Sequence, residues 1–233
     1  MKRLHVMITP TLAICLLAPT LLAQEKKGAT LERWGQVLDP DGDCKVRMDG
    51  GRVTIEVPPK LHDLSAEMGT VNAPRVLREV EGDFIAEVTV AGAVTPGGRP
   101  TRPRSLPFHG AGLLLWQDEK NFIRLERAAI LRDGRPMPYA NFEQRKGGAL
   151  ADGGPKALED KPLHLRLERR GSRVIGSVSF DGVRWTALKE LTADLPKAVK
   201  VGVAALNSAG TPFRAELEGY ELFVRADPGR PGP

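Results

Sequence analysis

The feature that most constrains the fold of this chain is a period-two alternation of apolar and polar residues. Successive side chains of a β-strand point to opposite faces, so such alternation predicts half-buried strands. Between residues 163 and 168, for example, three leucines alternate with His164, Arg166 and Glu168. The same pattern occurs in residues 52–57, 84–90, 121–127, 173–180, 199–205 and 213–224.

Turn-forming residues separate these segments. Glycine and proline number 25 and 19 among 233 residues, and Gly, Pro, Asp or Asn stands at every junction. Residues 44–57 read as a hairpin around a Gly-Gly turn. Residues 190–195 indicate one helical turn, whereas residues 96–107 and 146–162 predict long loops, where binding surfaces often develop. The whole pattern predicts an all-β sandwich or barrel.

The two ends of the chain differ from this pattern. Residues 1–23 combine Lys2 and Arg3, a short apolar stretch and a small residue at the expected cleavage point, which predicts a signal peptide. The stretch is too short for a membrane span, which needs about 20 residues. We therefore expect a secreted protein, extracellular or periplasmic, with one domain over residues 24–224 and a disordered tail over 225–233.

The charge pattern argues against a nucleic-acid partner. The formal net charge is +5, and removal of the leader with its two basic residues lowers it by two. Basic and acidic residues are interleaved, which is typical of a solvated sheet face. The exception is residues 99–104, which we interpret as a solvated loop rather than a site for anionic polymers. Cys44, the cysteine left after cleavage, is either a reactive thiol or, as its alternation favours, a buried one.

Four sequence segments resemble the concanavalin A-like β-sandwiches. They are GAGLLLWQDEKNFIRLE (110–126), VEGDF (80–84), SFDGVRWT (179–186) and VGVAA (201–205). Within these sandwiches, the segments resemble in particular the regulation-of-enolase-type family, which is related to the C-terminal module of family 43 β-xylosidases. The resemblance covers roughly residues 31–224. The resemblance implies a jelly roll of two antiparallel sheets, one of them concave, on which many relatives bind carbohydrate. That family has no established common reaction, so no catalytic residues are carried over.

A polar face with a few aromatic rings would suit a sugar. Trp116 ends an apolar run before two polar residues, and Tyr139, Asn141 and Glu143 alternate along one strand. We expect the ligand-binding face to comprise Trp116, Arg124, Glu126, Tyr139, Asn141, Glu143, His164 and Arg166. The alternative interpretation of these residues is an exposed sheet face of mixed charge.

A hydrolase is weakly supported by the acidic residues. The Glu-x-Asp-x-x-Glu spacing of laminarinase-like glycosidases does not occur. Glu126 and Glu168 are flanked by arginines, which lower a carboxyl pKa and so disfavour a general acid. We therefore expect a binding module without catalytic residues. The alternatives are a hydrolase or lyase that uses Glu126, Glu168 or Glu143, and an extracellular protein–protein interaction module.

No cofactor is expected, with calcium as the one ion left open. Asp39, Asp41 and Asp43 alternate like the start of a calcium loop, but the twelfth position is Gly50 rather than Glu. We favour a solvated Asp-rich turn over a calcium site that takes ligands from elsewhere. The histidines of the mature chain lack metal-binding spacing. The ligand, the metal content and the oligomeric state are not determined by these patterns.

Overall fold

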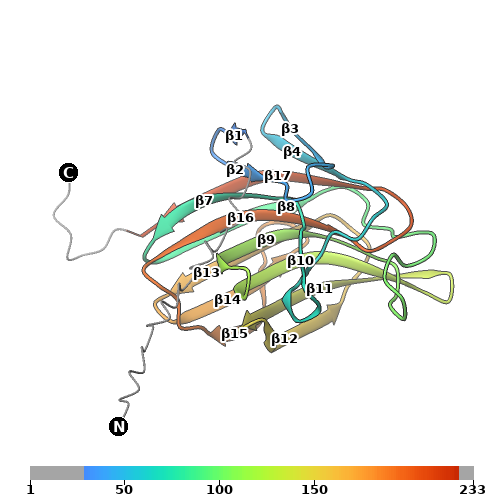
Figure 1. Cartoon of the computed structure of the whole chain (residues 1–233). Coiled ribbons are helices and arrows are strands. Elements are labelled where there is room, and N and C mark those ends of the chain that lie inside the picture. Colours follow the sequence, from blue (N-terminus) through green and yellow to red (C-terminus); the bar gives the residue numbers. More distant parts are fainter. Residues whose placement is uncertain (1–28, 226–233) are drawn as a thin grey trace, which may run out of the picture.

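The computed structural model describes residues 29–225. The expected leader and residues 226–233 of the expected tail lie outside this range. Nearly all of the regular secondary structure in the described chain is strand (Figure 1), and no helix within it is long and apolar enough to cross a lipid bilayer.

Two large antiparallel sheets form the molecule (Figure 1). The eight-stranded sheet has the order β1 (Thr30–Leu31), β2 (Gly35–Leu38), β7 (Arg75–Glu81), β16 (Ala198–Asn207), β9 (Phe108–Asp118), β10 (Asn121–Arg132), β11 (Arg135–Lys146), β12 (Ala149–Ala157). The seven-stranded sheet has the order β15 (Thr186–Thr192), β14 (Arg173–Ser179), β13 (Leu163–Arg170), β8 (Phe84–Val90), β17 (Phe213–Val224), β4 (Arg52–Val57), β3 (Lys45–Asp49). The predicted all-β, two-sheet antiparallel sandwich is confirmed.

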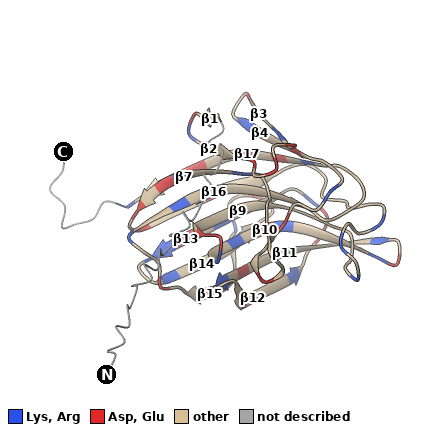
Figure 2. Cartoon of the chain, in the orientation of Figure 1, with Lys and Arg blue, Asp and Glu red and all other residues tan. Residues whose placement is uncertain are grey.

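The apolar stripes of the two sheets meet in one hydrophobic core. Leu163, Leu165 and Leu167 of β13 are fully buried, as are Ile123 and Leu125 of β10. Charged residues alternate with these stripes and face outward, and basic and acidic residues are interspersed over both sheets (Figure 2). On the outer face of the seven-stranded sheet, ion pairs link neighbouring strands through Arg52–Glu218, Arg214–Glu56 and Arg166–Glu87.

A segment that we call the covering segment, residues 58–74, crosses the outer face of the eight-stranded sheet (Figure 1). It contains the short hairpin β5 (Leu64–Ser65) and β6 (Thr70–Val71), joined by the 3-10 helix η1 (Ala66–Met68). Its Leu64 packs with Leu114, Trp116 and Phe122 in a second hydrophobic cluster. Asn207 at the end of β16 anchors it, because the backbones of His62 and Asn207 exchange hydrogen bonds of 2.8 and 2.9 Å.

Two local predictions were wrong. Residues 190–195 do not form a helical turn, since β15 extends to Thr192 and places Leu191 in the core opposite Val174. Residues 146–162 are not one loop, since β12 pairs with β11. Glycine is common in loops, but Gly153 lies so close to β11 that a Cβ would be 2.1 Å from the Phe142 carbonyl oxygen. Residues 96–107 do lack a strand, as predicted.

The core predicts that truncation of an inward-facing leucine destabilises the protein more than truncation of an outward-facing one. Leu165→Ala removes a fully buried side chain between the sheets and should lower the free energy of unfolding by about 2–5 kcal/mol. Leu150→Ala, at a half-exposed position of β12, is the matched control and should change it little. Urea denaturation of the two variants measures this difference, and equal losses would contradict the assigned orientation of β13.

Candidate functional site

The outer faces of β10 and β11 carry a cluster of buried polar side chains. Alternation turns Arg124 and Glu126 outward on β10, and Tyr139, Asn141 and Glu143 outward on β11. The hairpin register then sets Arg124 directly opposite Glu143, and Glu126 opposite Asn141. Five of the eight residues expected at the ligand face therefore lie together.

Arg124 is the centre of this cluster. Its Nε donates to Glu143 Oε1 at 2.5 Å and lies 3.6 Å from Glu126 Oε1. Its NH1 group lies 3.6 Å from Asp63 Oδ1 of the covering segment but makes no hydrogen bond within the described chain. Arg145 adds a second cation, with NH1 2.9 Å from Glu143 Oε1. Glu143 is thus shared between two guanidinium groups.

Glu126 lies in a different environment from Glu143. Asn141 Nδ2 donates to Glu126 Oε1 at 3.0 Å, whereas Oε2 is buried without a hydrogen-bond partner among residues 29–225. That oxygen faces Gly110, where a Cβ would lie 3.2 Å from it. Burial, together with the negative charge of Glu143, raises the pKa of Glu126 to about 7 against the opposing effect of Arg124. Near neutral pH this carboxyl group therefore holds a proton for part of the time.

A cavity of about 260 Å³ opens above this cluster, between the sheet, the covering segment and the loop before β9. We call it the sheet pocket, and define it by Asp63, Ser65, Arg102, Phe108, Arg124 and Tyr139. Arg102 reaches it from the predicted loop, with NH1 3.6 Å from Asp63 Oδ2 and NH2 3.0 Å from Thr70 Oγ1. Asp63 is itself fixed by Ser65 Oγ, which donates to it at 2.6 Å. The pocket thus combines arginine donors, a carboxylate acceptor and two aromatic rings, those of Phe108 and Tyr139.

Three of the expected residues lie elsewhere. Trp116 is not at a rim: it is 4% exposed, stacks on Phe122 and lies beneath the covering segment, with the Arg75 guanidinium 4.5 Å from its ring centroid. His164 and Arg166 belong to β13 and so to the other sheet. There the Arg166 guanidinium lies 3.9 Å from the Trp185 ring centroid. The eight residues therefore do not form one surface.

Sequence reasoning missed Asp63, Arg102, Arg145 and Glu67. Arg145 continues the outward alternation of β11, so that pattern could have identified it. It pairs with Glu67 of η1 at 3.0 and 3.2 Å. Arg102 lies in the predicted long loop and its basic stretch, which we interpreted as solvated, whereas Asp63 carries no local signal. Only the path of two irregular segments brings both residues to the sheet.

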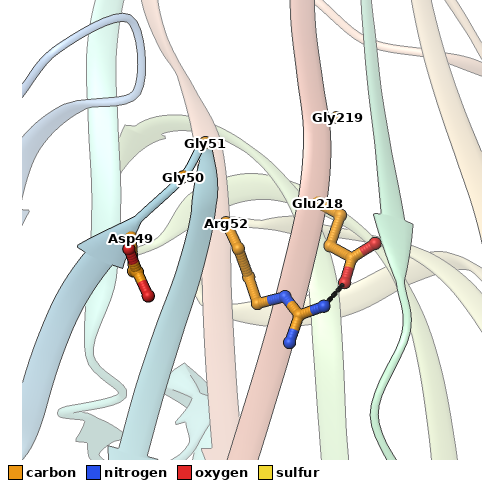
Figure 3. A pocket seen from close by; sticks show the side chains of 6 residues that line it. All are labelled: Asp49, Gly50, Gly51, Arg52, Glu218 and Gly219. Atoms are coloured by element: carbon orange, nitrogen blue, oxygen red, sulfur yellow. Dashed lines mark ion pairs between the residues drawn. The ribbon is translucent and has the colours of Figure 1, made fainter.

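A second cavity, of about 510 Å³, lies at the β3–β4 turn (Figure 3). Figure 3 shows Arg52 directed toward Glu218, and the two form an ion pair of 2.5 Å. The rest of the lining is Asp49 and three glycines of exposed turns. None of these lining residues holds a buried polar group that lacks a partner, so we regard the sheet pocket as the better candidate.

No protein-family model and no curated protein matches this chain. Among solved structures, a functionally unknown protein from Saccharomyces cerevisiae superposes with a TM-score of 0.60 at 17% identity, covering 78% of this chain and 93% of that one. The GH43 protein BlXynB from Bacillus licheniformis has a TM-score of 0.61 at 15% identity, covering 82% and 36%. A xylan β-1,4-xylosidase from Bacillus halodurans has 0.55 at 13%, covering 77% and 38%.

The chain thus corresponds to little more than a third of the length of either bacterial protein. At identities this low, the superpositions establish a related β-sandwich fold. They do not place the chain in one family.

The raised pKa of Glu126 predicts a pH-dependent stability. Because the folded state binds this proton more tightly than the unfolded state, the wild type should lose stability as the pH rises from about 4.5 to about 7. A tenfold difference in proton affinity between the two states corresponds to about 1.4 kcal/mol. Glu126→Gln resembles the protonated group, so it should remove this contribution to the slope of unfolding free energy against pH. Urea denaturation over a pH series measures that slope.

The matched control is Glu119→Gln, at an exposed position of the β9–β10 turn. It should retain the wild-type slope. An unchanged slope in Glu126→Gln would show that Glu126 is ionised throughout this range.

Proposed function

We propose that this chain is a secreted, non-catalytic β-sandwich that binds a neutral carbohydrate in the sheet pocket. The observation that carries the proposal is the pocket lining. Sugar hydroxyl groups both donate and accept hydrogen bonds, and the pocket offers arginine donors, the Asp63 acceptor and the hydroxyl groups of Ser65 and Tyr139. The Tyr139 ring adds a surface for the apolar face of a sugar.

The choice of a neutral sugar follows from the charges around the pocket. Arg124 is paired with Glu143, Arg102 lies beside Asp63, and Arg145 is paired with Glu67. Cations and carboxylates are therefore balanced, and an anionic ligand would have to compete with carboxylates already in place. Arg124 lines the pocket, and its NH1 group makes no hydrogen bond to any described residue.

The fold neighbours favour the carbohydrate class. One is a GH43 protein, and another is named a xylan β-1,4-xylosidase. Xylan is therefore the first ligand to test. We also retain the finer assignments made from the sequence: a concanavalin A-like sandwich of the regulation-of-enolase type, exported by a signal peptide to the extracellular space or periplasm.

A glycoside hydrolase that uses Glu126 and Glu143 is the second candidate. The pKa of Glu126 is raised, whereas Glu143 is paired with arginines. In glycoside hydrolases a similar difference in environment distinguishes the general acid from the second carboxylate. However, Glu126 and Glu143 are only 1% and 6% exposed, and neither lines the sheet pocket. A bound substrate would not reach them without rearrangement, so we favour binding alone.

Binding and hydrolysis can be separated with the purified chain and a panel of neutral polysaccharides that includes xylan. We expect saturable retention by at least one polysaccharide, without release of reducing ends. Arg102→Ala and Tyr139→Ala should weaken binding at least about tenfold, because each removes a lining group. Arg104→Ala, an exposed residue of the same loop, is the control and should bind like the wild type.

Three outcomes would overturn the proposal. Retention that Arg102→Ala and Tyr139→Ala leave unchanged would place the ligand elsewhere. Reducing ends that Glu126→Gln abolishes would establish the hydrolase. Retention by no polysaccharide would favour an extracellular protein–protein interaction module.

A further inference from the structure

A second cluster of reactive side chains lies where the covering segment begins. Asp43 and Cys44 immediately precede β3, and His62 belongs to the covering segment. One ligand atom from each of the three residues lies within 4.8 Å of the others. None of the three residues lines the sheet pocket, so this cluster is independent of the proposed carbohydrate site.

The distances from Asp43 Oδ1 to the other two ligand atoms match those within a tetrahedral metal site. His62 Nε2 lies 3.2 Å from Asp43 Oδ1, and Cys44 Sγ lies 3.7 Å from that same oxygen. Zinc binds nitrogen and oxygen at about 2.0–2.2 Å and sulfur at about 2.3 Å, so tetrahedral donors are separated by roughly 3.3–3.7 Å. Little movement would therefore be needed to hold one ion among the three.

The orientation of His62 is an independent observation that points to a ligand. The side chain is fully buried, and Nε2 makes no hydrogen bond with the described part of the chain although it faces Asp43. Nδ1 lies 3.5 Å from the Asn72 carbonyl oxygen, 3.8 Å from Asp41 Oδ2 and 3.9 Å from Cys44 Sγ. Donation from Nδ1–H to that carbonyl leaves the Nε2 lone pair facing a carboxylate oxygen, and a cation between these two acceptors would satisfy both.

The donor set selects the class of ion. Nitrogen, sulfur and carboxylate donors suit zinc and similar transition metals, whereas calcium requires oxygen ligands. The alternating aspartates do not converge as a calcium loop would require. Asp39 accepts the backbone N–H groups of Gly42 and Cys44 at 3.1 and 2.9 Å, and Asp41 accepts Asn72 Nδ2 at 2.7 Å.

We propose that Asp43 Oδ1, Cys44 Sγ and His62 Nε2 bind one divalent transition-metal ion of the zinc class, with water at the fourth position. As the metal–sulfur bond forms, the Cys44 thiol releases its proton to solvent. Asp43 keeps its 2.8 Å ion pair with Lys60 through the other oxygen, Oδ2. The ion would tie residues 43–44 to the covering segment and so stabilise the wall that supplies Asp63 to the sheet pocket.

Titration of the metal-free full-length chain with Co²⁺ tests this proposal. We expect one equivalent to bind with thiolate-to-metal charge-transfer absorption in the near ultraviolet, and Zn²⁺ to displace it. Cys44→Ser should abolish this absorption, and Asp43→Asn should weaken binding at least about tenfold. His164→Gln, at a histidine of β13 outside the cluster, is the matched control and should titrate like the wild type.

Thermal unfolding provides a second readout. Zn²⁺ should raise the melting temperature of the wild type and of His164→Gln, but not that of Cys44→Ser, because an ion that binds only the folded state stabilises it. Absence of saturable Co²⁺ binding would overturn the proposal and leave His62 in contact with Asp43 alone. Absorption that survives in Cys44→Ser, or displacement of Co²⁺ by equimolar Ca²⁺, would also overturn it.

Discussion

Burial of both faces of the eight-stranded sheet is the constraint on which the other features of this protein depend. Its inner face packs against the seven-stranded sheet, as in any sandwich. Part of its outer face packs beneath the covering segment, through Leu64 on Leu114, Trp116 and Phe122. This second layer removes Arg124 and Glu126 from water, shapes the sheet pocket and positions His62. Without it, the outer face would be an ordinary solvated sheet of mixed charge.

The buried charges contribute more to geometry than to stability. Removing Arg124, Glu143 and Glu126 from water is costly, and their mutual attraction only partly offsets that cost. In return, each group is held by at least one partner, so Arg124 is fixed at the pocket before a ligand arrives. A preformed pocket suits equilibrium binding of a small neutral ligand. It suits catalysis less well, because the two carboxylates lie out of reach of the cavity.

The two proposed sites share the covering segment but rest on separate contacts. His62 and Asp63 are consecutive, yet His62 turns toward Asp43 while Asp63 turns toward Arg102 and Arg124. The backbone bridge to Asn207 fixes this point of the chain. A metal ion at His62 would therefore reinforce an anchor that the fold already provides. Loss of the ion would make the pocket wall more mobile. It would not remove a direct contact between the sheet pocket and the carbohydrate.

Local patterns in the chain were enough to predict an all-β sandwich or barrel and the shared face of Arg124, Glu126, Asn141 and Glu143. The two-sheet architecture was implied by the resemblance to the concanavalin A-like sandwiches. Alternation is local, and the β10–β11 hairpin joins adjacent segments, so its register follows from short-range order. Alternation states which way a side chain points but not which sheet a strand joins, and His164 and Arg166 therefore fell on the other sheet.

The burial of Trp116 and the approach of Asp63, Arg102 and His62 came from long-range packing instead. They depend on irregular segments that carry no periodic signal of their own. The paths of those segments are set by contacts between residues far apart in the chain, such as the backbone bridge between His62 and Asn207.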